Sequence, residues 1–240
     1  MFSVEREGEL ARLVLDRGQA RNAIPLEGWA RLAELIAEIA ASPANLLVVT
    51  GATGVFCAGA DLGDFARLRG DEVAREAFRV DMRRGLESVR ALEIPVVAWI
   101  EGPCYGAGVA LAMACDLRIA ALSASFAITP AKIGISYPQE DVHRLIELVG
   151  TGQAARLLFT AGSIDSAEAH RIGLVDLIAD DLAAILGSIA ANDSESLRVL
   201  KLAIRRAADG VRQDESLDRR FDELVAGDAL ARRLEALRRK

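Results

Sequence analysis

The sequence predicts an α/β fold that ends in a helical region, and two features of the chain lead to this class. In the first half, short apolar runs of the kind found in buried strands alternate with segments of helical periodicity, a pattern typical of α/β proteins. From about Gln139 onward the periodicity is mostly helical. We therefore expect a mixed core over residues 1–190 and a helical C-terminal region over residues 191–240.

The first half of the chain supplies the strands. Residues 2–8 and 10–16 alternate with a period of two around a short turn, which predicts a β-hairpin. An amphipathic helix is expected over residues 25–42, with Pro25 at its entrance. The segments expected next are a buried strand at 46–52, a charged helix within 64–90, a buried strand at 95–102, a short apolar helix at 108–114 and strands at 115–121 and 123–128.

The second half is helical apart from residues 174–178, whose sequence LVDLI indicates a strand. Residues 194–240 are amphipathic and strongly charged, and two interpretations of this face stay open. The charge pattern favours a face exposed to solvent. The alternative is a face that packs against a partner subunit.

The bulk composition excludes several classes of protein. Of the 240 residues, 52% are hydrophobic and 27% are charged, which is typical of a globular chain. The net charge of −6 argues against nucleic-acid binding and gives no attraction to an anionic membrane. Residues 1–12 lack the apolar segment of a secretory signal, and the apolar run at 94–100 is too short to span a bilayer. The spacing of the cysteines and the two histidines lead us to expect a cytoplasmic protein with no metal site.

Two loops rich in glycine and alanine, FCAGADL at 56–62 and CYGAGVALA at 104–112, each follow a strand-like run. Small residues let a ligand approach the backbone closely, and the first N–H groups of a helix have no partner within that helix. Two such N–H groups from separate loops would form an oxyanion hole, which stabilises negative charge on a carbonyl oxygen. The alternative is that the glycines only permit tight packing between strand and helix.

Other glycine motifs fit this chain less well. Gly106 and Gly108 match the start of a dinucleotide-binding fingerprint, but Leu111 stands where the third glycine belongs. The acidic residue that the fingerprint expects about 20 residues later is missing. The chain contains neither the G-K-[ST] of a P-loop nor the G-x-S-x-G of a nucleophile elbow. A dehydrogenase is therefore the remotest alternative.

The sequence resembles the crotonase superfamily, the enoyl-CoA hydratase/isomerase family, over nearly its whole length. The segments that carry the resemblance are LDRGQARNAI (15–24), TGATGVFCAGADL (50–62), PVVAWIEGPCYGAGVALAMACDLRIA (95–120), SASFAITPAKIGI (123–135) and FTAGSIDSAEAHRIGLVDLI (159–178). The resemblance implies a crotonase-like spiral of ββα units with a helical C-terminal region that mediates trimerisation, as a homotrimer or a dimer of trimers. It also implies an acyl-coenzyme A thioester as substrate, a place in fatty acid metabolism, and no cofactor besides the coenzyme A of the substrate.

By this resemblance, the oxyanion donors are the backbone N–H groups of Ala60 and Ala107. Ala60 follows A-G in the first loop, and Ala107 is the middle of the small-residue triplet in the second. The residues that the resemblance places along the path of the coenzyme A moiety are Arg21, Ala23, Ala58, Asp61 and Leu62. The charge of Arg21 also suits a phosphate contact, and the alternative for this residue is a solvated surface side chain.

The sequence departs from the family at the two positions on which hydration depends. The two glutamates that a hydratase of this family uses fall at Ala110 and Pro130, and neither side chain can transfer a proton. Hydration by the two-carboxylate route is therefore not expected, nor is an isomerase that depends on the second glutamate. Residues 134–145 offer Tyr137, Glu140 and other polar side chains as replacements.

Tyr137 and Glu140 are the side chains that we expect to take part in catalysis. Tyr137 matches the T-P-x-x-x-G-[IV]-x-Y pattern of the methylmalonyl-CoA decarboxylase branch, in which a Tyr at this position lies in the active site. That branch, however, has His where this chain has Ala60, and it keeps the first glutamate. Tyr137 could instead pack its ring and bond within a loop, and Glu140 or its neighbour Asp141 could stabilise a helix N-terminus.

The remaining polar candidates are expected to be structural. His143 and His170 lie in helical segments, and nothing in the sequence lowers the thiol pKa of Cys57 or Cys104. The sequence therefore predicts an enzyme that acts on an acyl-CoA thioester through an enolate held by a backbone oxyanion hole. Two alternatives stay open, a methylmalonyl-CoA-decarboxylase-like enzyme and a catalytically silent acyl-CoA-binding protein.

Overall fold

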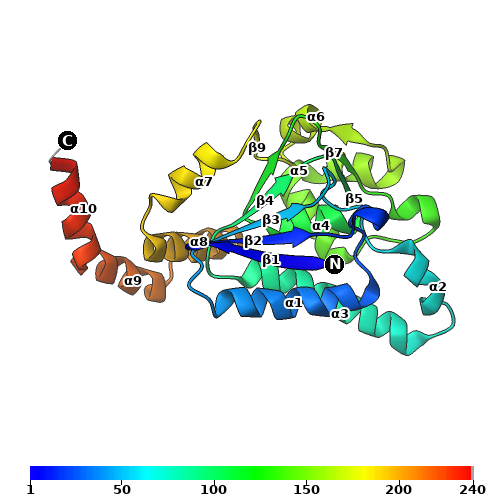
Figure 1. Ribbon diagram of the computed structural model, residues 1–240, viewed down its shortest axis with the longest axis horizontal. Coiled ribbons are helices and arrows are strands. Elements are labelled where there is room, and N and C mark those ends of the chain that lie inside the picture. The colour runs from blue at the N-terminus through cyan, green and yellow to red at the C-terminus, as the bar shows by residue number, and fades with distance from the viewer. Residues whose placement is uncertain (239–240) are drawn as a thin grey trace. The chain divides into compact units, whose positions relative to one another are not determined.

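The larger part of the chain is built around a six-stranded sheet, seen in the computed structural model, which describes residues 1–238 (Figure 1). The strand order is β1-β2-β3-β4-β6-β9, in which β1 and β2 form an antiparallel hairpin and the later neighbours are parallel. The strands are β1 (Phe2–Glu7), β2 (Leu10–Leu15), β3 (Leu46–Gly51), β4 (Val96–Ile100), β6 (Leu117–Ala120) and β9 (Leu177–Ile178). The predicted hairpin and the buried strands of the sequence are thereby confirmed.

A second, three-stranded sheet was only partly expected from the sequence. Its order is β5 (Pro103–Tyr105), β7 (Ser125–Ala127) and β8 (Ile164–Asp165). The strand expected at 123–128 is β7. The other two strands are short, and β5 lies inside what the sequence predicted as a loop. Their strand geometry comes from pairing with β7, parallel for β5 and antiparallel for β8, which a local sequence pattern does not report.

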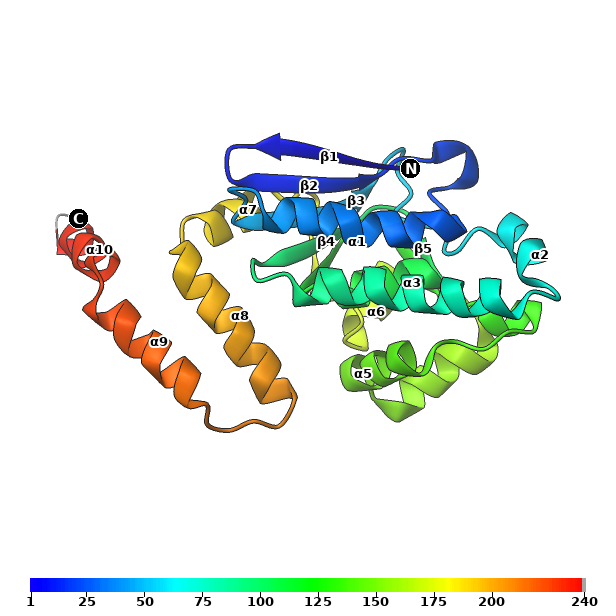
Figure 2. The same ribbon diagram turned by 90° about the horizontal axis from the view of Figure 1, so that it is seen from below.

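The helices α1 and α3 lie side by side on one face of the large sheet (Figure 2). Their close approach depends on Gly85 of α3, because a Cβ atom at this position would lie 2.8 Å from the carbonyl oxygen of Trp29. The helix expected within 64–90 is interrupted at Gly70, whose φ is +79°, and Asp71 then caps α3 by accepting a bond from the N–H of Ala74. The helices of this unit are α1 (Leu26–Ala40), α2 (Phe65–Leu68), α3 (Glu72–Ala91), α4 (Ala107–Ala114), α5 (Gln139–Thr160) and α6 (Ser166–Arg171).

The short helix α4 is buried on all sides over Gly108–Ala114. Its alanines and glycine bring it close to the first glycine loop, since a Cβ atom at Gly108 would lie 2.6 Å from the carbonyl oxygen of Cys57. The next helix, α5, is kinked at Gly150, where φ is +74° and ψ is 162°. A central, tightly packed α4 and the first turn of α5 are the two helical elements that position the site.

The smaller unit comprises Glu93–Pro95 and the chain from Ala183 onward. Its helices are α7 (Ala183–Ala190), α8 (Ser194–Ala208), α9 (Glu215–Ala226) and α10 (Asp228–Arg238). Asp193 caps α8, and the buried Lys201 donates from Nζ to the carbonyl oxygen of Ile94 at 2.9 Å. The helical C-terminal region predicted from the sequence is therefore present.

None of the helices formed by residues 1–238 combines the length and the apolar character that a membrane crossing requires.

Candidate active site

The two glycine loops predicted from the sequence lie against each other. Cys57 and Cys104 form an isolated parallel bridge, in which the N–H of Cys57 donates to the carbonyl oxygen of Pro103 and the N–H of Tyr105 donates to that of Cys57. Gly59 makes this approach possible, since a Cβ atom there would lie 3.0 Å from the carbonyl oxygen of Tyr105. Its φ of +107° is also a conformation that side chains rarely adopt.

The amides of Ala60 and Ala107, the two predicted oxyanion donors, are unpaired in this arrangement. The bridge between Ile24 and Ala60 uses the carbonyl oxygen of Gly59 and the N–H of Asp61, and it leaves the Ala60 N–H unused. Ala107 is the first residue of α4, where an N–H has no partner within the helix. Within residues 1–238, no protein acceptor takes a bond from either amide. Both are available to a ligand oxygen.

Both amides border a single cavity of about 440 Å³. Apolar side chains of the segment between the first loop and α3 line one part of it, and the segment around η3 (Pro130–Ile133) lines another. The residues that line this cavity include Ala60, Leu62, Phe65, Phe78, Arg79, Met82, Ala107, Lys132, Ile133, Tyr137 and Asp141. A volume of this size holds a small organic group between the two amides.

Tyr137 is buried beside the second loop and fixes one of the two donors. Its hydroxyl group donates to the carbonyl oxygen of Gly106 at 3.0 Å. That oxygen belongs to the same peptide unit as the Ala107 N–H, so the bond holds the orientation of this amide. Burial, and then the charge of Asp141, raise the pKa of Tyr137 well above its usual range. Tyr137 is therefore a neutral donor that positions the second glycine loop.

The other donor is fixed in the same way. The N–H of Ile24 donates to the carbonyl oxygen of Gly59 at 2.8 Å, and this oxygen belongs to the peptide unit that carries the Ala60 N–H. Hydrogen bonds to a peptide carbonyl polarise the N–H on its other side. Each predicted oxyanion donor is thus both oriented and polarised from behind.

Asp141 supplies the carboxyl group of the cavity. It lies in the first turn of α5 with 2% of its surface exposed, and its Oδ1 is 3.4 Å from Nη1 of Arg144. Burial, followed by the charge of Glu140, raises the pKa of Asp141 to about 7. A carboxyl group with this pKa exists in both protonation states near neutral pH, which suits a general acid or base.

Glu140, the acid that we expected to be catalytic, points elsewhere. Its Oε1 is 2.6 Å from Nη2 of Arg83, and nearly half of its side chain is exposed. Of these two adjacent acids, Asp141 lines this cavity and Glu140 does not. His143 is mostly exposed beside Glu147, and the exposed His170 has its Nδ1 3.1 Å from the carbonyl oxygen of Val175.

The raised pKa of Asp141 makes the stability of the fold depend on pH. In the unfolded chain an Asp side chain ionises near pH 4, whereas in the folded chain Asp141 keeps its proton until about pH 7. Protonation thus stabilises the fold at low pH, and this contribution is lost as the pH rises through the folded pKa. The side chain in Asp141→Asn does not ionise, so the variant does not lose stability in this way. Between about pH 5 and about pH 8, the difference in unfolding free energy between the two proteins should therefore shift by about 3 kcal/mol in favour of the variant.

Urea unfolding at the two pH values measures this difference. Glu140→Gln, which alters the exposed neighbour, is the matched control, and its stability relative to the wild type is expected to change much less between the two pH values. If Asp141→Asn changes the free energy of unfolding equally at the two pH values, the raised pKa of Asp141 is contradicted.

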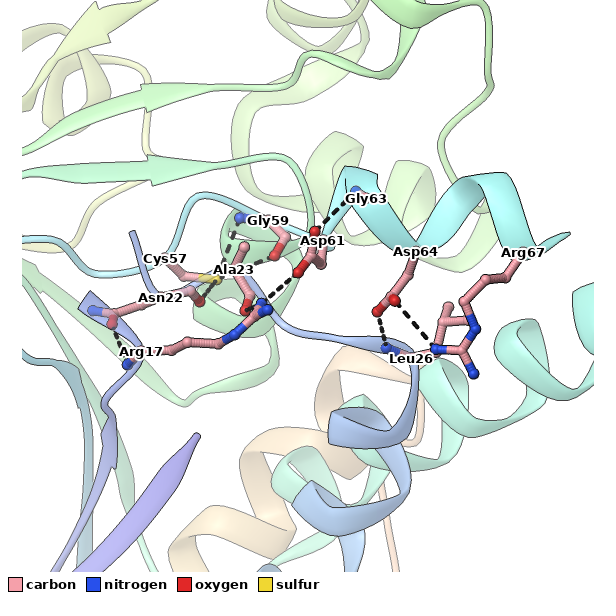
Figure 3. A network of polar contacts seen from close by, with 10 residues as sticks. All are labelled: Arg17, Asn22, Ala23, Leu26, Cys57, Gly59, Asp61, Gly63, Asp64 and Arg67. Carbon is pink, nitrogen blue, oxygen red and sulfur yellow. Dashed lines mark hydrogen bonds and ion pairs between the residues drawn. The ribbon is translucent and has the colours of Figure 1, made fainter. Parts of the chain in front are cut away.

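The residues expected along the coenzyme A path divide into two groups. Ala58 and Leu62 line the cavity. Arg21 is exposed, and its carbonyl oxygen accepts a bond from the N–H of Ala58. Asp61 and Ala23 are instead engaged by one side chain, because Nη1 of Arg17 contacts Oδ2 of Asp61 at 2.5 Å and donates to the carbonyl oxygen of Ala23 (Figure 3). This contact with Arg17 lowers the pKa of Asp61.

Asn22 and Arg17 are structural residues of the site that the sequence reasoning missed. The side chain of Asn22 is fully buried, and its Nδ2 donates to the carbonyl oxygens of Ala52 and Val55. Its Oδ1 accepts from the N–H of Arg17 (Figure 3). Asn22 thereby ties the segment before α1 to the start of the first loop. Both residues belong to the segment LDRGQARNAI (15–24), one of those that carry the family resemblance, and this was the available signal.

We expect Asn22→Ala to destabilise the fold by about 3 kcal/mol, because it removes the donor from two carbonyl oxygens inside the protein. The φ of +59° at this position, which Asn tolerates better than Ala, acts in the same direction. Urea unfolding measures the loss, with the exposed Gln19→Ala as control. Equal stabilities of the two variants would show that Asn22 does not hold the loop.

The cysteines near the site are unreactive. Cys57, Cys104 and Cys115 are buried. Burial raises the pKa of the Cys57 thiol to about 12 and also raises that of Cys104. Cys57 donates from Sγ to the carbonyl oxygen of Asn22, as part of the same network (Figure 3). In the part of the chain that the structure describes, no three His, Cys, Asp or Glu side chains gather to hold a metal ion.

Comparison with known proteins shows a clear set of relatives. The family model for enoyl-CoA hydratase/isomerase matches residues 5–223. A crotonyl-CoA hydratase of Syntrophomonas wolfei is 34% identical over 219 residues, which span 88% of this chain and 82% of that protein. A short-chain-enoyl-CoA hydratase of Clostridium acetobutylicum is 31% identical over 211 residues, spanning 85% of this chain and 80% of that protein.

The solved structure of an enoyl-CoA hydratase/carnithine racemase from Magnetospirillum magneticum superposes on this chain with a TM-score of 0.93. The two sequences are 30% identical, and the superposition covers 99% of this chain and 92% of the other. This likeness confirms the fold class predicted from the sequence, an α/β spiral with a helical C-terminal region.

Proposed function

The chain belongs to the enoyl-CoA hydratase/isomerase family, and from this premise we propose that it moves a proton at the α-carbon of an acyl-CoA thioester. One observation carries the proposal: the cavity that holds the unpaired amides of Ala60 and Ala107 also holds the buried carboxyl group of Asp141. Two amide donors suit the oxygen of an enolate. The carboxyl group suits the transfer of the proton.

The reaction that this arrangement supports best is migration of a double bond along the acyl chain. The Asp141 carboxylate takes a proton from Cα, and the electron pair of the broken C–H bond moves into the thioester to form an enolate. The enolate oxygen accepts hydrogen bonds from Ala60 and Ala107. The protonated Asp141 then gives a proton to Cγ, so the double bond moves from the β,γ to the α,β position. This reaction needs no cofactor besides the coenzyme A of the substrate.

Hydration fits the site less well, because it needs one group to activate water and another to protonate Cα. The family resemblance assigns these roles to the positions of Ala110 and Pro130. Ala110 is buried in α4, and Pro130 borders the cavity. Neither side chain can carry a proton, which leaves Asp141 as the carboxyl group of this cavity.

An apolar acyl chain suits the walls of the cavity. Phe65 and Phe78 form an edge-to-face pair with ring centroids 5.6 Å apart, and Leu62, Met82 and Ile133 line the same space. At the rim, Lys132 is exposed and borders the cavity, so its charge is available to the phosphates of coenzyme A together with that of Arg21.

The test uses β,γ-unsaturated acyl-CoA thioesters of several chain lengths, with formation of the conjugated product followed by its ultraviolet absorbance. We expect isomerisation, and no hydration of crotonyl-CoA at a comparable rate. Calorimetric titration with acetyl-CoA and crotonyl-CoA reports binding separately from turnover. Binding without any turnover would leave a silent acyl-CoA-binding protein, and failure to bind at millimolar ligand would overturn the proposal.

Decarboxylation of a malonyl-type thioester is the second candidate, and the burial of Tyr137 at the cavity favours it. Loss of CO₂ generates the same enolate without a base, and the Tyr137 hydroxyl group holds the amide that would stabilise it. Tyr137→Phe should lower such turnover by loosening the Ala107 amide. Unchanged turnover of malonyl- and methylmalonyl-CoA by this variant would count against the candidate.

We also propose that the chain assembles as a homotrimer or a dimer of trimers through its C-terminal helices. The support lies within the smaller unit, where α8, α9 and α10 carry exposed apolar side chains. These are Leu200, Ile204, Phe221, Val225, Leu230 and Leu234. Light scattering measures the mass directly, and a monomeric mass at micromolar concentration would contradict this assembly.

A further inference from the structure

Asp141 lines the acyl cavity and also a second cavity of about 260 Å³, as do Arg79, Met82 and Pro138. The two cavities differ in character. The acyl cavity is lined mostly by apolar side chains, whereas charged side chains of α3 and α5 line the second cavity together with Met82, Leu86 and Pro138. Its charged lining residues are Arg79, Arg83, Glu87, Glu140, Asp141 and Arg144. Asp141 therefore borders both the acyl cavity and the second cavity.

The polar contacts of the second cavity connect Asp141 to the outside. Nη1 of Arg144 lies 3.4 Å from Oδ1 of Asp141, and Nη2 of the same guanidinium contacts Oε1 of Glu87. Arg144 is buried, whereas more than two fifths of the Glu87 side chain is exposed. The ion pair between Arg83 and Glu140 joins α3 to α5 beside this path.

We propose that the second cavity is the proton entrance of the active site, through which solvent protons exchange with Asp141 without passing the bound acyl chain. This inference rests on the proposed function, because it assigns a route to the proton that Asp141 carries. An acyl chain filling the larger cavity would exclude water from that side. The second cavity, which has charged side chains of α3 and α5 in its lining, would remain open to solvent.

The surroundings of Asp141 support exchange at this group. The titratable or charged groups that line the two cavities with it are Tyr137 before α5, Glu140 and Arg144 on α5, Arg79, Arg83 and Glu87 on α3, and Lys132 on η3. Tyr137 is held neutral and bonded to Gly106, so it does not compete for the proton. The carboxyl group itself changes state near neutral pH, which permits rapid loss and gain of the proton.

The chemistry predicts a measurable label. When Asp141 takes a proton from Cα in D₂O, its carboxyl proton exchanges with a deuteron from the second cavity and leaves as HOD. The enolate then takes this deuteron at Cγ, so each product molecule carries one C–D bond at this carbon. Without the second entrance, the same proton would return from Asp141 to the substrate, and the product would stay unlabelled.

The test blocks the second cavity from outside. Gln139 is exposed and lines this cavity, while Cys57, Cys104 and Cys115 are buried, so a Gln139→Cys variant offers one accessible thiol. One sample is modified with a bulky maleimide and the other with a small methylthio group as matched control. Circular dichroism confirms that both retain the fold, and mass spectrometry measures deuterium per product molecule.

We expect the unmodified and methylthio proteins to label the product, and the bulky modification to lower the label about tenfold while turnover persists, since transfer within the closed site needs no water. An unlabelled product from the wild-type enzyme, or equal label in both modified samples, would overturn the proton entrance while leaving the proposed function intact. Absence of turnover on every thioester would overturn the proposed function itself, and this inference with it.

Discussion

Asp141→Asn is expected to lower turnover of the thioester substrate about 10²–10⁴-fold, the range that general acid–base groups contribute. The amide keeps the size of the carboxyl group and can still face Arg144, but it cannot accept the proton from Cα. The Michaelis constant should change little, because the substitution preserves the size of this side chain and leaves the apolar lining of the cavity unchanged. Steady-state kinetics on the best β,γ-unsaturated thioester measures both constants.

Glu140→Gln is the matched control for this prediction, because it makes the same chemical change one residue earlier at an exposed ion pair. It should retain most of the activity. The wild-type rate should also rise with pH through about pH 7, as the carboxylate form of Asp141 becomes populated, and level off above it. If Asp141→Asn keeps wild-type turnover, the proton is carried by another group.

Ala107→Pro is expected to lower turnover about 10²–10³-fold, as the loss of one oxyanion donor does in comparable sites. Proline has no N–H, so the change removes the donor and nothing polar from the side chain. The fold should survive, since Ala107 is the first residue of α4 and proline is well accepted at that helical position. The effect should fall on kcat, because the donor contributes most when charge develops on the thioester oxygen.

Ala107→Gly provides the control, since it alters the side chain and keeps the N–H. It should retain activity close to that of the wild type. Binding of acetyl-CoA by the proline variant, measured by calorimetry, shows whether the loss is chemical and not a collapse of the cavity. Equal kcat values for the proline and glycine variants would exclude the Ala107 amide from the reaction.

The sequence predicted those parts of the fold and site that depend on local patterns. The buried strands β3 and β4 have continuous apolar runs, and the two glycine loops are recognisable from their glycine and alanine content. The strand β5 was missed because its three residues become a strand only by pairing with β7, which lies some twenty residues away in the chain.

The choice between Glu140 and Asp141 could not be made from the sequence. Both acids occupy the first turn of α5, and the side of the helix that faces the cavity depends on the path of the chain through Tyr137 and Pro138. Similarly, nothing local indicates that Asp61 is paired with Arg17, which lies forty-four positions earlier. Tertiary packing decides both cases.

The two amide donors have a consequence for how this protein can change. Gly59 and Gly106 offer their carbonyl oxygens to Ile24 and Tyr137, and the amides on the far sides of these peptides are aimed as a result. The predicted oxyanion site is therefore formed by backbone groups, and it does not depend on the side chains of Ala60 and Ala107. Side chains that determine acyl-group specificity or transfer the proton can therefore be substituted while the two backbone amides keep their positions. For protein engineering, the proposed oxyanion hole could be combined with a new acid, base or binding pocket, provided that the bonds from Ile24 and Tyr137 are kept.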